Sequence, residues 1–340
     1  MSPSLYQLIL FVVIVLLTTE ATSPAPTRFK SLLYNWKGYN IRYCQKGPED
    51  GQPLILIHGF GASLDYYRKQ IPAFAENGYS VYAIDLLGFG GSEKAIKPLG
   101  KGYSASLWAN QILDFYNDVV VSKANQNANQ KNKQKVILAG NSIGSRIALE
   151  AALLAPDSIR GLLLYNAAAG INNKFTLTDT LTPLSIKLFA IPIFTLLDVL
   201  LKNEGFSSWL FERTRKPENI LSTLQSVYSN KESCDEELVN SIATAAQDPN
   251  ALKVFVEILT QDAGKTPDTF MEKISCPIKF IWGNADPFTP LDGPYGLYFQ
   301  NLCKLRRDTS MTVVTGGHCP HDDFHEEANT AALQWLKELS

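Results

Sequence analysis

The stretch KVILAGNSIG, residues 135–144, decides the fold of this chain. Its apolar run ends in glycine, as a buried parallel strand does, and alanines at helical spacing follow from Ala148 onward. Between strand and helix, residues 140–144 fit the pattern G-x-S-x-G, in which a sharp turn lifts the serine hydroxyl clear of the sheet. Gly140 and Gly144 must be small, because strand and helix pass close together there. We therefore interpret Ser142 as a nucleophile.

Strands and helices alternate on both sides of this turn. Buried strands are predicted in PLILIHG (53–59), YSVYAID (79–85), IRGLLLYNAA (159–168), PIKFIWG (277–283) and MTVVTGG (311–317). Helices are predicted within DYYRKQIPAFAENGY (65–79), with Gly78 just past the helix end, in SLWANQILDFYNDVVV (106–121), and in the last residues, where Ala328, Ala332, Trp335 and Leu339 share one face. This alternation predicts an α/β fold, a mostly parallel, doubly wound sheet with helices on both faces. KSLLYNW and YNIRYCQ around Lys37-Gly38 add a β-hairpin.

The alternation stops over residues 170–268 and resumes afterwards. That segment is helical and irregular in character, with apolar clusters such as LFAIPIFTLL (188–197). We expect a core of residues 31–169 and 269–340 that carries a helical cap, 170–268. A polar, low-complexity tract at 123–134 is expected to be a surface loop.

The N-terminus has the character of a targeting segment. LILFVVIVLL (8–17) suits the apolar region of a signal peptide and is too short to cross a bilayer alone. Residues 1–21 are therefore expected to be a signal peptide, with an uncleaved anchor as the alternative, and 22–30 a linker or a second targeting element. The chain is expected to enter the secretory pathway. Its destination stays open between a plastid reached through that pathway and secretion or the endoplasmic reticulum.

The composition is that of an ordinary globular protein. The 340 residues are 45% hydrophobic and carry a formal net charge of −2, which offers no case for nucleic-acid binding. The five cysteines are scattered without CxxC spacing, which argues against a disulfide framework or a structural zinc cluster. No cofactor is predicted.

An acid and a base follow the last two predicted strands. Asp286 lies three residues past Gly283, and His318 lies two residues past Gly316. The order serine, acid, histidine is the one expected for a nucleophile at such a turn. We expect His318 to take the proton of Ser142 and Asp286 to orient the imidazole. Asp85, Asp262 and Asp292 are the alternative candidates for the role of Asp286.

The loop HGFG, after the first buried strand, is expected to help stabilise an oxyanion. Cleavage of an ester by a serine needs two backbone N–H donors at the carbonyl oxygen. We expect them to come from Phe60 and from Ile143. Gly59 and Gly61 would let the first of these turn inward, and His58 is expected to order the loop by hydrogen bonding.

Three of the four histidines lie in GGHCPHDDFH, residues 316–325. A zinc site is disfavoured, because only His321 and His325 have the i, i+4 spacing and Pro320 precedes them. No metal is predicted. Cys319 is expected to pack beneath the loop, Asp322 or Asp323 to cap the closing helix, and His325 to face solvent.

These motifs resemble those of the α/β-hydrolase superfamily. The resemblance covers roughly Leu32 to Leu339 and rests on HGFG, DLLGFGGS, GNSIG, GNADPFTP and GGHCPHDD in their proper order. Asn141, the DPFTP turn and the HCPHD run are most similar to the plastid pheophytinase and chlorophyll-dephytylase-like branch. Ser145 is a departure, since many members have a second glycine there. Nothing in the sequence itself indicates a porphyrin.

The resemblance implies a serine hydrolase that cleaves a carboxylic ester of a hydrophobic substrate, such as the phytyl ester of a chlorophyll derivative. Haloalkane dehalogenases and epoxide hydrolases use an aspartate at this turn, so Ser142 favours acyl transfer. Peroxidase and carbon–carbon hydrolase members keep the serine and stay as alternatives, as does a non-catalytic ligand-binding protein. The cap or the N-terminus is a candidate for contact with a membrane surface, and the oligomeric state is left open.

Overall fold

The computed structural model describes residues 29–123 and 134–339. The predicted signal peptide, nearly all of the linker and nearly all of the polar loop lie outside the described residues.

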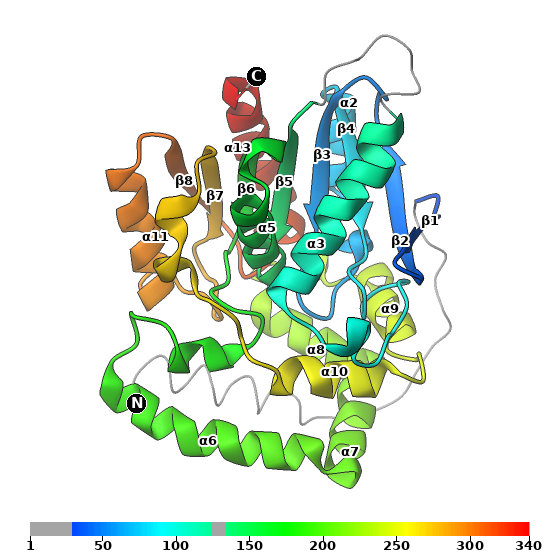
Figure 1. The fold of residues 1–340 in the computed structure, drawn as a ribbon, viewed down its shortest axis with the longest axis vertical. Helices are drawn as coiled ribbons and strands as arrows, with labels where there is room; N and C mark the ends of the chain where they lie inside the picture. The colour runs from blue at the N-terminus through cyan, green and yellow to red at the C-terminus, as the bar shows by residue number, and fades with distance from the viewer. Residues whose placement is uncertain (1–28, 124–133, 340) are drawn as a thin grey trace.

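Eight strands form one sheet, in the order β1-β2-β4-β3-β5-β6-β7-β8 (Figure 1). The strands are β1 (Leu32–Trp36), β2 (Tyr39–Lys46), β3 (Gln52–Ile57), β4 (Tyr79–Ile84), β5 (Val136–Asn141), β6 (Ile159–Tyr165), β7 (Ile278–Gly283) and β8 (Thr309–Val314). The first two form the predicted hairpin, β2 pairs antiparallel with β4, and all later pairs are parallel. The predicted α/β-hydrolase fold with a mostly parallel sheet is confirmed.

The position of β3 between β4 and β5 determines where a site can form. From β3 the chain moves to β4 on one side, and it then returns to place β5 on the other. In open α/β sheets such a reversal opens a crevice at the carboxyl ends of the strands. His58 follows β3 and Ser142 follows β5, so both lie at this edge.

Helices cover both faces of the sheet. One face carries α3 (Ala105–Phe115), α5 (Ile143–Leu154) and α11 (Pro294–Leu305), and the other carries α2 (Gln70–Glu76) and α13 (His325–Leu339) (Figure 1). Successive strand side chains point to opposite faces, so β3 supplies Ile55 and Ile57 to one core and Leu54 and Leu56 to the other. Shorter helical segments are η2 (Leu64–Tyr67), η3 (Pro98–Gly100), η4 (Tyr116–Val121), η5 (Pro156–Ser158) and α12 (Pro320–Asp323).

The single helix predicted over residues 65–79 is instead η2 followed by α2. Pro72 explains the break. It has no N–H to donate to the carbonyl of Arg68, and its ring collides with that carbonyl in a continuous helix. The helix therefore starts again at Gln70, which places Pro72 in the first turn, where no donor is required.

Five helices lie between β6 and β7. They are α6 (Leu184–Lys202), α7 (Glu204–Thr214), α8 (Pro217–Val227), α9 (Glu236–Ala245) and α10 (Ala251–Thr260). The short turn η6 (Asn173–Leu177) precedes α6, η7 (Lys231–Ser233) connects α8 to α9, and η8 (Pro267–Thr269) and η9 (Met271–Lys273) lead from α10 to β7. We refer to this group as the cap; its expected limits, 170 and 268, stay a prediction. In Figure 1 the cap lies below the sheet, with α6 and α7 farthest from it.

Candidate active site

Ser142 occupies the turn between β5 and α5. Its backbone adopts φ +54° and ψ −121°, a conformation that residues other than glycine rarely adopt. Its N–H is bound to the carbonyl of Tyr165 at 3.0 Å. Such a conformation persists only where the surroundings enforce it, and it is common at functional sites.

The glycines on either side leave no room for a side chain. A Cβ on Gly140 would lie 2.4 Å from the carbonyl carbon of Gly144. A Cβ on Gly144 would lie 2.1 Å from the carbonyl oxygen of Ile57, at the end of β3. The turn is therefore pressed against the end of the neighbouring strand, which brings the loop after β3 to the serine.

Asp286 and His318 are in contact. His318 Nδ1 lies 2.9 Å from Asp286 Oδ2 and 3.0 Å from Oδ1, and both side chains are buried. They follow the paired strands β7 and β8, which brings them together from 32 residues apart. Because Nδ1 faces a carboxylate, it carries the proton, and Nε2 is the nitrogen left to act as a base.

Two further side chains bind the same carboxylate. Asn166 Nδ2 donates to Asp286 Oδ2 at 2.5 Å, and the Thr289 hydroxyl also donates to it. Burial alone would raise the pKa of Asp286. The charge and hydrogen bond of His318, with the bonds from Thr289 and Asn166, outweigh that effect and hold the pKa below its ordinary value. The acid is therefore ionised where it meets the imidazole.

Asn141 connects the serine turn to the histidine loop. Its Nδ2 donates to the carbonyl oxygen of His318 at 3.0 Å and to that of Tyr165 at 3.3 Å. Among the described hydrogen bonds none joins the Ser142 hydroxyl to the His318 ring. Contacts of this kind often tighten only when substrate is bound.

The two expected oxyanion donors face no partner. Within the described part of the chain, the N–H groups of Phe60 and Ile143 donate no hydrogen bond. Ile143 is the first residue of α5, where N–H groups lack acceptors inside the helix. A Cβ on Gly59 would lie 3.4 Å from Ser142 Cβ, so the loop of Phe60 passes directly beside the serine. Gly61 has φ +69°, which glycine accepts without strain.

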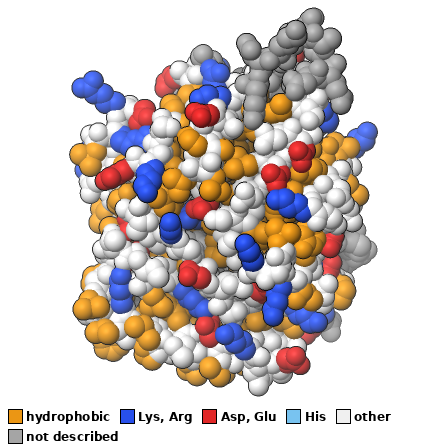
Figure 2. All heavy atoms as spheres, viewed as in Figure 1, with side chains coloured by type: hydrophobic (Ala, Val, Ile, Leu, Met, Phe, Trp, Pro, Cys, Tyr) orange, Lys and Arg blue, Asp and Glu red, His pale blue; other side chains and the backbone are white. Residues whose placement is uncertain are grey.

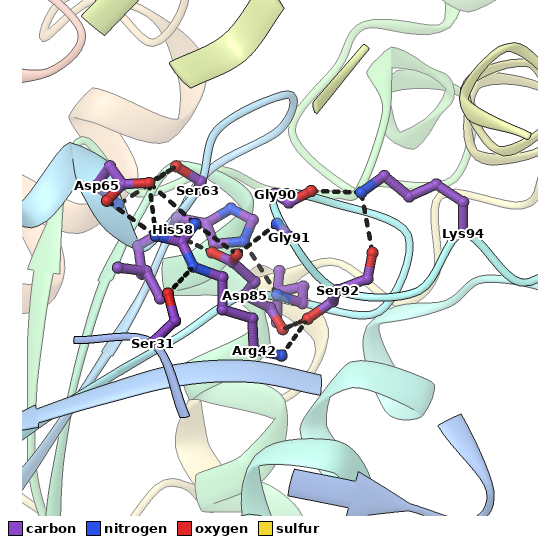
Figure 3. A network of polar contacts seen from close by, with 12 residues as sticks. Ser31, Arg42, His58, Ser63, Asp65, Asp85, Gly90, Gly91, Ser92 and Lys94 are labelled. Carbon is purple, nitrogen blue, oxygen red and sulfur yellow. Dashed lines mark hydrogen bonds and ion pairs between the residues drawn. The ribbon is translucent and has the colours of Figure 1, made fainter. Parts of the chain in front are cut away.

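A buried polar network holds this loop (Figure 3). His58 Nε2 accepts the N–H of Leu86, and Nδ1 donates to the carbonyl of Gly59 at 2.8 Å. Burial holds the pKa of His58 below its ordinary value, so the ring is neutral, as these two bonds require. The neighbouring Asp85 accepts the N–H groups of Leu64 and Gly91. The loops after β3 and β4 are thereby tied together.

Asp85 is not the acid of the site. Arg42 binds it at 3.2 Å and binds Asp65 at 3.0 Å, which places Asp85 in the network of Figure 3 instead of beside His318. Asp262 accepts the N–H of Gly264. Among the described contacts, neither Asp262 nor Asp292 reaches the His318 ring.

The other residues of GGHCPHDDFH hold the loop. His321 is buried between the rings of Tyr67 and Tyr165, at centroid distances of 4.9 and 5.2 Å. Burial, with the nearby His318, lowers the pKa of His321 to about 3. Cys319 is buried, and its sulfur lies 3.8 Å from Asn141 Oδ1. His325 is partly exposed at the start of α13.

The expectation that Asp322 or Asp323 caps a helix is wrong. The closing helix, α13, begins at His325 directly after Phe324, and both aspartates lie in the separate short helix α12. Asp322 instead binds Arg68 Nε at 2.8 Å, and Asp323 accepts the backbone N–H groups of Gly317, Ser229 and Asn230. These carboxylates attach the histidine loop to its surroundings.

The cap contacts the same loop. The N–H of His318 donates to the carbonyl of Val227 at 2.7 Å, and Arg68 also binds Asp235, at the start of α9. The ring of Phe288 lies 5.1 Å from that of His318. From α10, Phe255 reaches the side chain of Phe60. The site is therefore bordered by aromatic rings and by the cap.

Sequence reasoning missed Asn166, Thr289 and Arg68. Asn166 gave one usable signal, because it is a polar residue directly after an apolar strand. No group of three or more His, Cys, Asp or Glu side chains that could hold a metal ion is found among the described residues.

The sequence profile of the alpha/beta hydrolase fold family matches residues 52–325, which span every element of this site. The chain belongs to the α/β-hydrolase family.

Among relatives of this α/β-hydrolase is the chloroplastic pheophytinase of Arabidopsis thaliana, 25% identical over 95% of this chain and 69% of the relative. Another is the 2-hydroxy-6-oxo-6-(2'-aminophenyl)hexa-2,4-dienoic acid hydrolase of Metapseudomonas resinovorans, 26% identical over 89% of each chain. The crystal structure of a serine hydrolase involved in carbazole degradation, CarC, superposes with a TM-score of 0.64 at 22% identity, covering 91% of this chain and 99% of that one. The protein is therefore similar to hydrolases with different substrates.

Proposed function

We propose that this α/β-hydrolase cleaves a carboxylic ester of a hydrophobic substrate through an acyl-enzyme on Ser142. The observation that carries the proposal is the pairing of Asp286 with His318 at the strand edge where the strained Ser142 turn lies. An ionised, buried carboxylate that fixes the imidazole is what a serine nucleophile requires.

Each residue has a defined step in this reaction. Ser142 Oγ attacks the carbonyl carbon while His318 Nε2 takes its proton. The N–H groups of Phe60 and Ile143 stabilise the resulting oxyanion. His318 then delivers the proton to the leaving alcohol, which departs and leaves the acyl group on Ser142. Water, deprotonated by His318, releases the acid and restores the serine.

The surroundings of the site support a hydrophobic substrate. Phe60 packs edge-on against Phe89 and touches Phe255 of the cap, while Phe288 packs against His318. Apolar and aromatic side chains with a few placed polar groups are typical of small-molecule sites. The similarity to pheophytinase makes a phytyl ester of a chlorophyll derivative the first candidate.

A second candidate reaction is hydrolysis of a carbon–carbon bond. It is favoured by the similarity to the 2-hydroxy-6-oxo-hexadienoic acid hydrolase, which covers most of both chains. A non-catalytic ligand-binding role is the remaining alternative. The intact Asp286–His318 pair counts against it, because a pure binder has no need of an oriented base.

A substrate comparison separates these possibilities. Purified wild type and Ser142→Ala are assayed for release of p-nitrophenol from short-chain esters, of phytol from pheophytin, and for cleavage of a 2-hydroxy-6-oxo-dienoic acid. We expect ester turnover in wild type and in the matched control Ser222→Ala, which changes an exposed serine of α8, but not in Ser142→Ala. Equal turnover in wild type and Ser142→Ala would sink the proposal. Turnover of the dienoic acid alone would replace it with the second candidate.

A pair of histidine variants tests the base. His318→Ala is expected to abolish turnover, whereas His321→Ala keeps substantial activity, since His321 only packs between two tyrosines. The reverse result would overturn the assignment of His318.

Entry into the secretory pathway remains part of the proposal. It is supported by the uncharged, apolar character of residues 8–17. Fusion of residues 1–30 to a reporter protein should deliver the reporter to the endoplasmic reticulum. A reporter that stays in the cytosol would contradict the proposed entry into the secretory pathway.

A further inference from the structure

Helix α6 turns an apolar face outward. Every exposed residue from Leu184 to Val199 is uncharged, and the large ones are Leu184, Leu188, Phe189, Ile191, Leu196 and Val199. Phe189 is 73% exposed and Leu188 61%. In a helix that faces water the outward side carries the polar and charged residues. Here the outward side is apolar instead.

The charged side chains of this segment point to the protein instead. Lys187 forms an ion pair with Asp179, and Asp198 forms one with Lys174 at 2.7 Å. Lys187 and Asp198 are the charged residues of α6 before Lys202 at its end. The outward face is thus left without charge along most of the helix.

The helix lies along the surface of the cap. Of the described helices, α6 is the one long and apolar enough to cross a membrane. It is neither N-terminal, as a signal sequence is, nor buried, as a core helix is, since only Ala190, Phe194 and Leu201 are buried. Because it packs lengthwise on η6, α7 and α10, its apolar face is a strip on the outside of the molecule. Apolar side chains gather along the lower edge of Figure 2, where Figure 1 places α6.

Basic residues accompany this strip. Residues 171–216 contain six Lys and Arg against four Asp and Glu, in a chain whose net charge is −2. Lys202 and Lys216 are exposed at the end of α6 and just before α8. Glu204 and Glu212 are exposed as well, but Arg215 pairs with Glu212, so the segment keeps a small basic excess. An outward apolar face with such an excess complements a bilayer that has anionic headgroups.

We propose that the outward face of α6 docks on an anionic phospholipid bilayer, with the helix lying in the plane of the interface. Its leucines and Phe189 enter the boundary between headgroups and acyl chains, and the lysines meet the lipid phosphates. Docking does not depend on the proposed hydrolysis. Helix α10 packs against α6 and also supplies Phe255 beside Phe60, so a bilayer at α6 is one helix away from the oxyanion loop.

A fluorescence experiment on the full chain tests this contact directly. Of the five tryptophans, Trp209 is half exposed and the other four are buried. In a Trp209→Phe background, Phe189→Trp places one exposed probe on α6. Leu305→Trp places the matched control probe on α11, where Leu305 is 83% exposed. Both proteins are mixed with vesicles of phosphatidylcholine and phosphatidylglycerol in equal amounts, with and without nitroxide-labelled lipid.

We expect the probe on α6 to shift to shorter wavelength with vesicles and to be quenched by a shallow nitroxide, while the probe on α11 does neither. Equal quenching of the two probes would show that another part of the chain, including the apolar N-terminus, makes the contact, and would overturn the proposal. A shift of the α6 probe with rising protein concentration and no lipid would identify a second copy as the partner instead.

Introducing negative charge on the apolar face completes the test. Leu188→Glu with Val199→Glu, introduced into the Phe189→Trp protein, should weaken vesicle binding through α6 at least about tenfold, because two carboxylates would have to enter the interface. Both residues are exposed, so an unchanged melting temperature is expected and serves as the folding control. Undiminished quenching in this variant would contradict the proposal.

Discussion

At the scale of single residues, Asn166 is the side chain that holds the carboxylate of Asp286 in place. Its left-handed backbone, φ +41°, lets Nδ2 donate to Asp286 while Oδ1 accepts the N–H of Gly283 at 3.0 Å. Asn166→Gly keeps that backbone accessible and removes the amide. We expect kcat to fall by up to about 100-fold with KM little changed, because a misplaced acid misaligns the base.

The control for this loss is Asn77→Gly, at the exposed end of α2, which should leave kcat unchanged. Steady-state kinetics on one ester measure both variants. An Asn166→Gly enzyme with wild-type kcat would show that Thr289 and His318 suffice to position Asp286.

His321 makes stability depend on pH. Its folded pKa is about 3, because burial opposes its charge, and its Nδ1 has no hydrogen-bond partner among the described residues. Since the unfolded chain takes up this proton near pH 6.5 and the folded chain does not, stability falls as pH drops from about 6.5 towards 3. Within this range, His321 lowers the free energy of unfolding by up to about 1.4 kcal/mol for each unit of pH decrease.

The variant His321→Phe keeps an aromatic ring between Tyr67 and Tyr165 and removes this proton. Its free energy of unfolding, from denaturant titrations between pH 7 and 5, should therefore decline less steeply than that of wild type. Parallel curves for the two proteins would mean that His321 is not buried as described.

The sequence predicts those residues of the site whose distance from the end of a strand is set by a motif. Ser142, Asp286 and His318 each follow an apolar strand by a short, countable distance. Asn166 and Thr289 could not be found this way, since their role depends on side-chain geometry around Asp286 and not on spacing. The sequence does not predict the role of Asp322 and Asp323, because a cap depends on which residue directly precedes the helix. Phe324 precedes α13, and the two aspartates bind Arg68 and loop N–H groups instead.

At the scale of elements, the close passage of α5 and β3 restricts the turn that carries Ser142. A Cβ on Gly144 would meet the backbone oxygen of Ile57 at 2.1 Å, and backbone cannot rotate away. Gly144→Ala should cost roughly 3 kcal/mol or more of unfolding free energy, or displace the turn and abolish activity.

Gly205→Ala is the matched control, because its Cβ would meet only Asn203 Oδ1, at an ordinary 3.4 Å, within α7. It should stabilise the protein by up to about 1 kcal/mol through helix propensity. Chemical denaturation compares the two. Equal stability of both variants would contradict the close packing at the turn.

The order of the strands and helices in the sheet is predictable from the apolar runs that end in glycine. Helix ends are less so, as the division of residues 65–79 into η2 and α2 shows. The helical spacing of apolar residues continues through Pro72, but the backbone hydrogen bonds of a helix cannot, because proline has no N–H.

At the scale of the whole molecule, Arg68 joins the core, the histidine loop and the cap. It is 2% exposed, binds Asp322 from the loop and Asp235 from α9, and donates to the carbonyl of Ser233. Arg68→Met would leave the carboxylate of Asp322 buried without its cation. We expect a loss of about 3–5 kcal/mol in unfolding free energy.

Two further variants make this prediction specific. Adding Asp322→Asn to Arg68→Met should recover part of the loss, because the unpaired charge disappears. Arg215→Met breaks the partly exposed pair with Glu212 and should cost no more than about 1 kcal/mol. Thermal or denaturant unfolding of wild type, Arg68→Met, Asp322→Asn and the double variant measures the coupling. Strictly additive losses would mean that Arg68 does not act through Asp322.

Contacts of this range lie beyond sequence reasoning. Arg68 and Asp322 are 254 residues apart, and although Asp322 lies in GGHCPHDD, Arg68 belongs to none of the motifs. Sequence patterning places the cap between two strands, but it does not indicate that the cap holds the loop of His318. That connection requires the packed structure.

The most direct test of the central claim is labelling with a fluorophosphonate, which reacts with an activated serine in an oriented site. Intact-mass measurement of wild type should show one adduct, and peptide mapping should place it on Ser142. Ser142→Ala should remain unlabelled, and His318→Ala should react far more slowly. Labelling of Ser142→Ala to the same extent as wild type, or no labelling of the folded wild-type protein, would contradict the account.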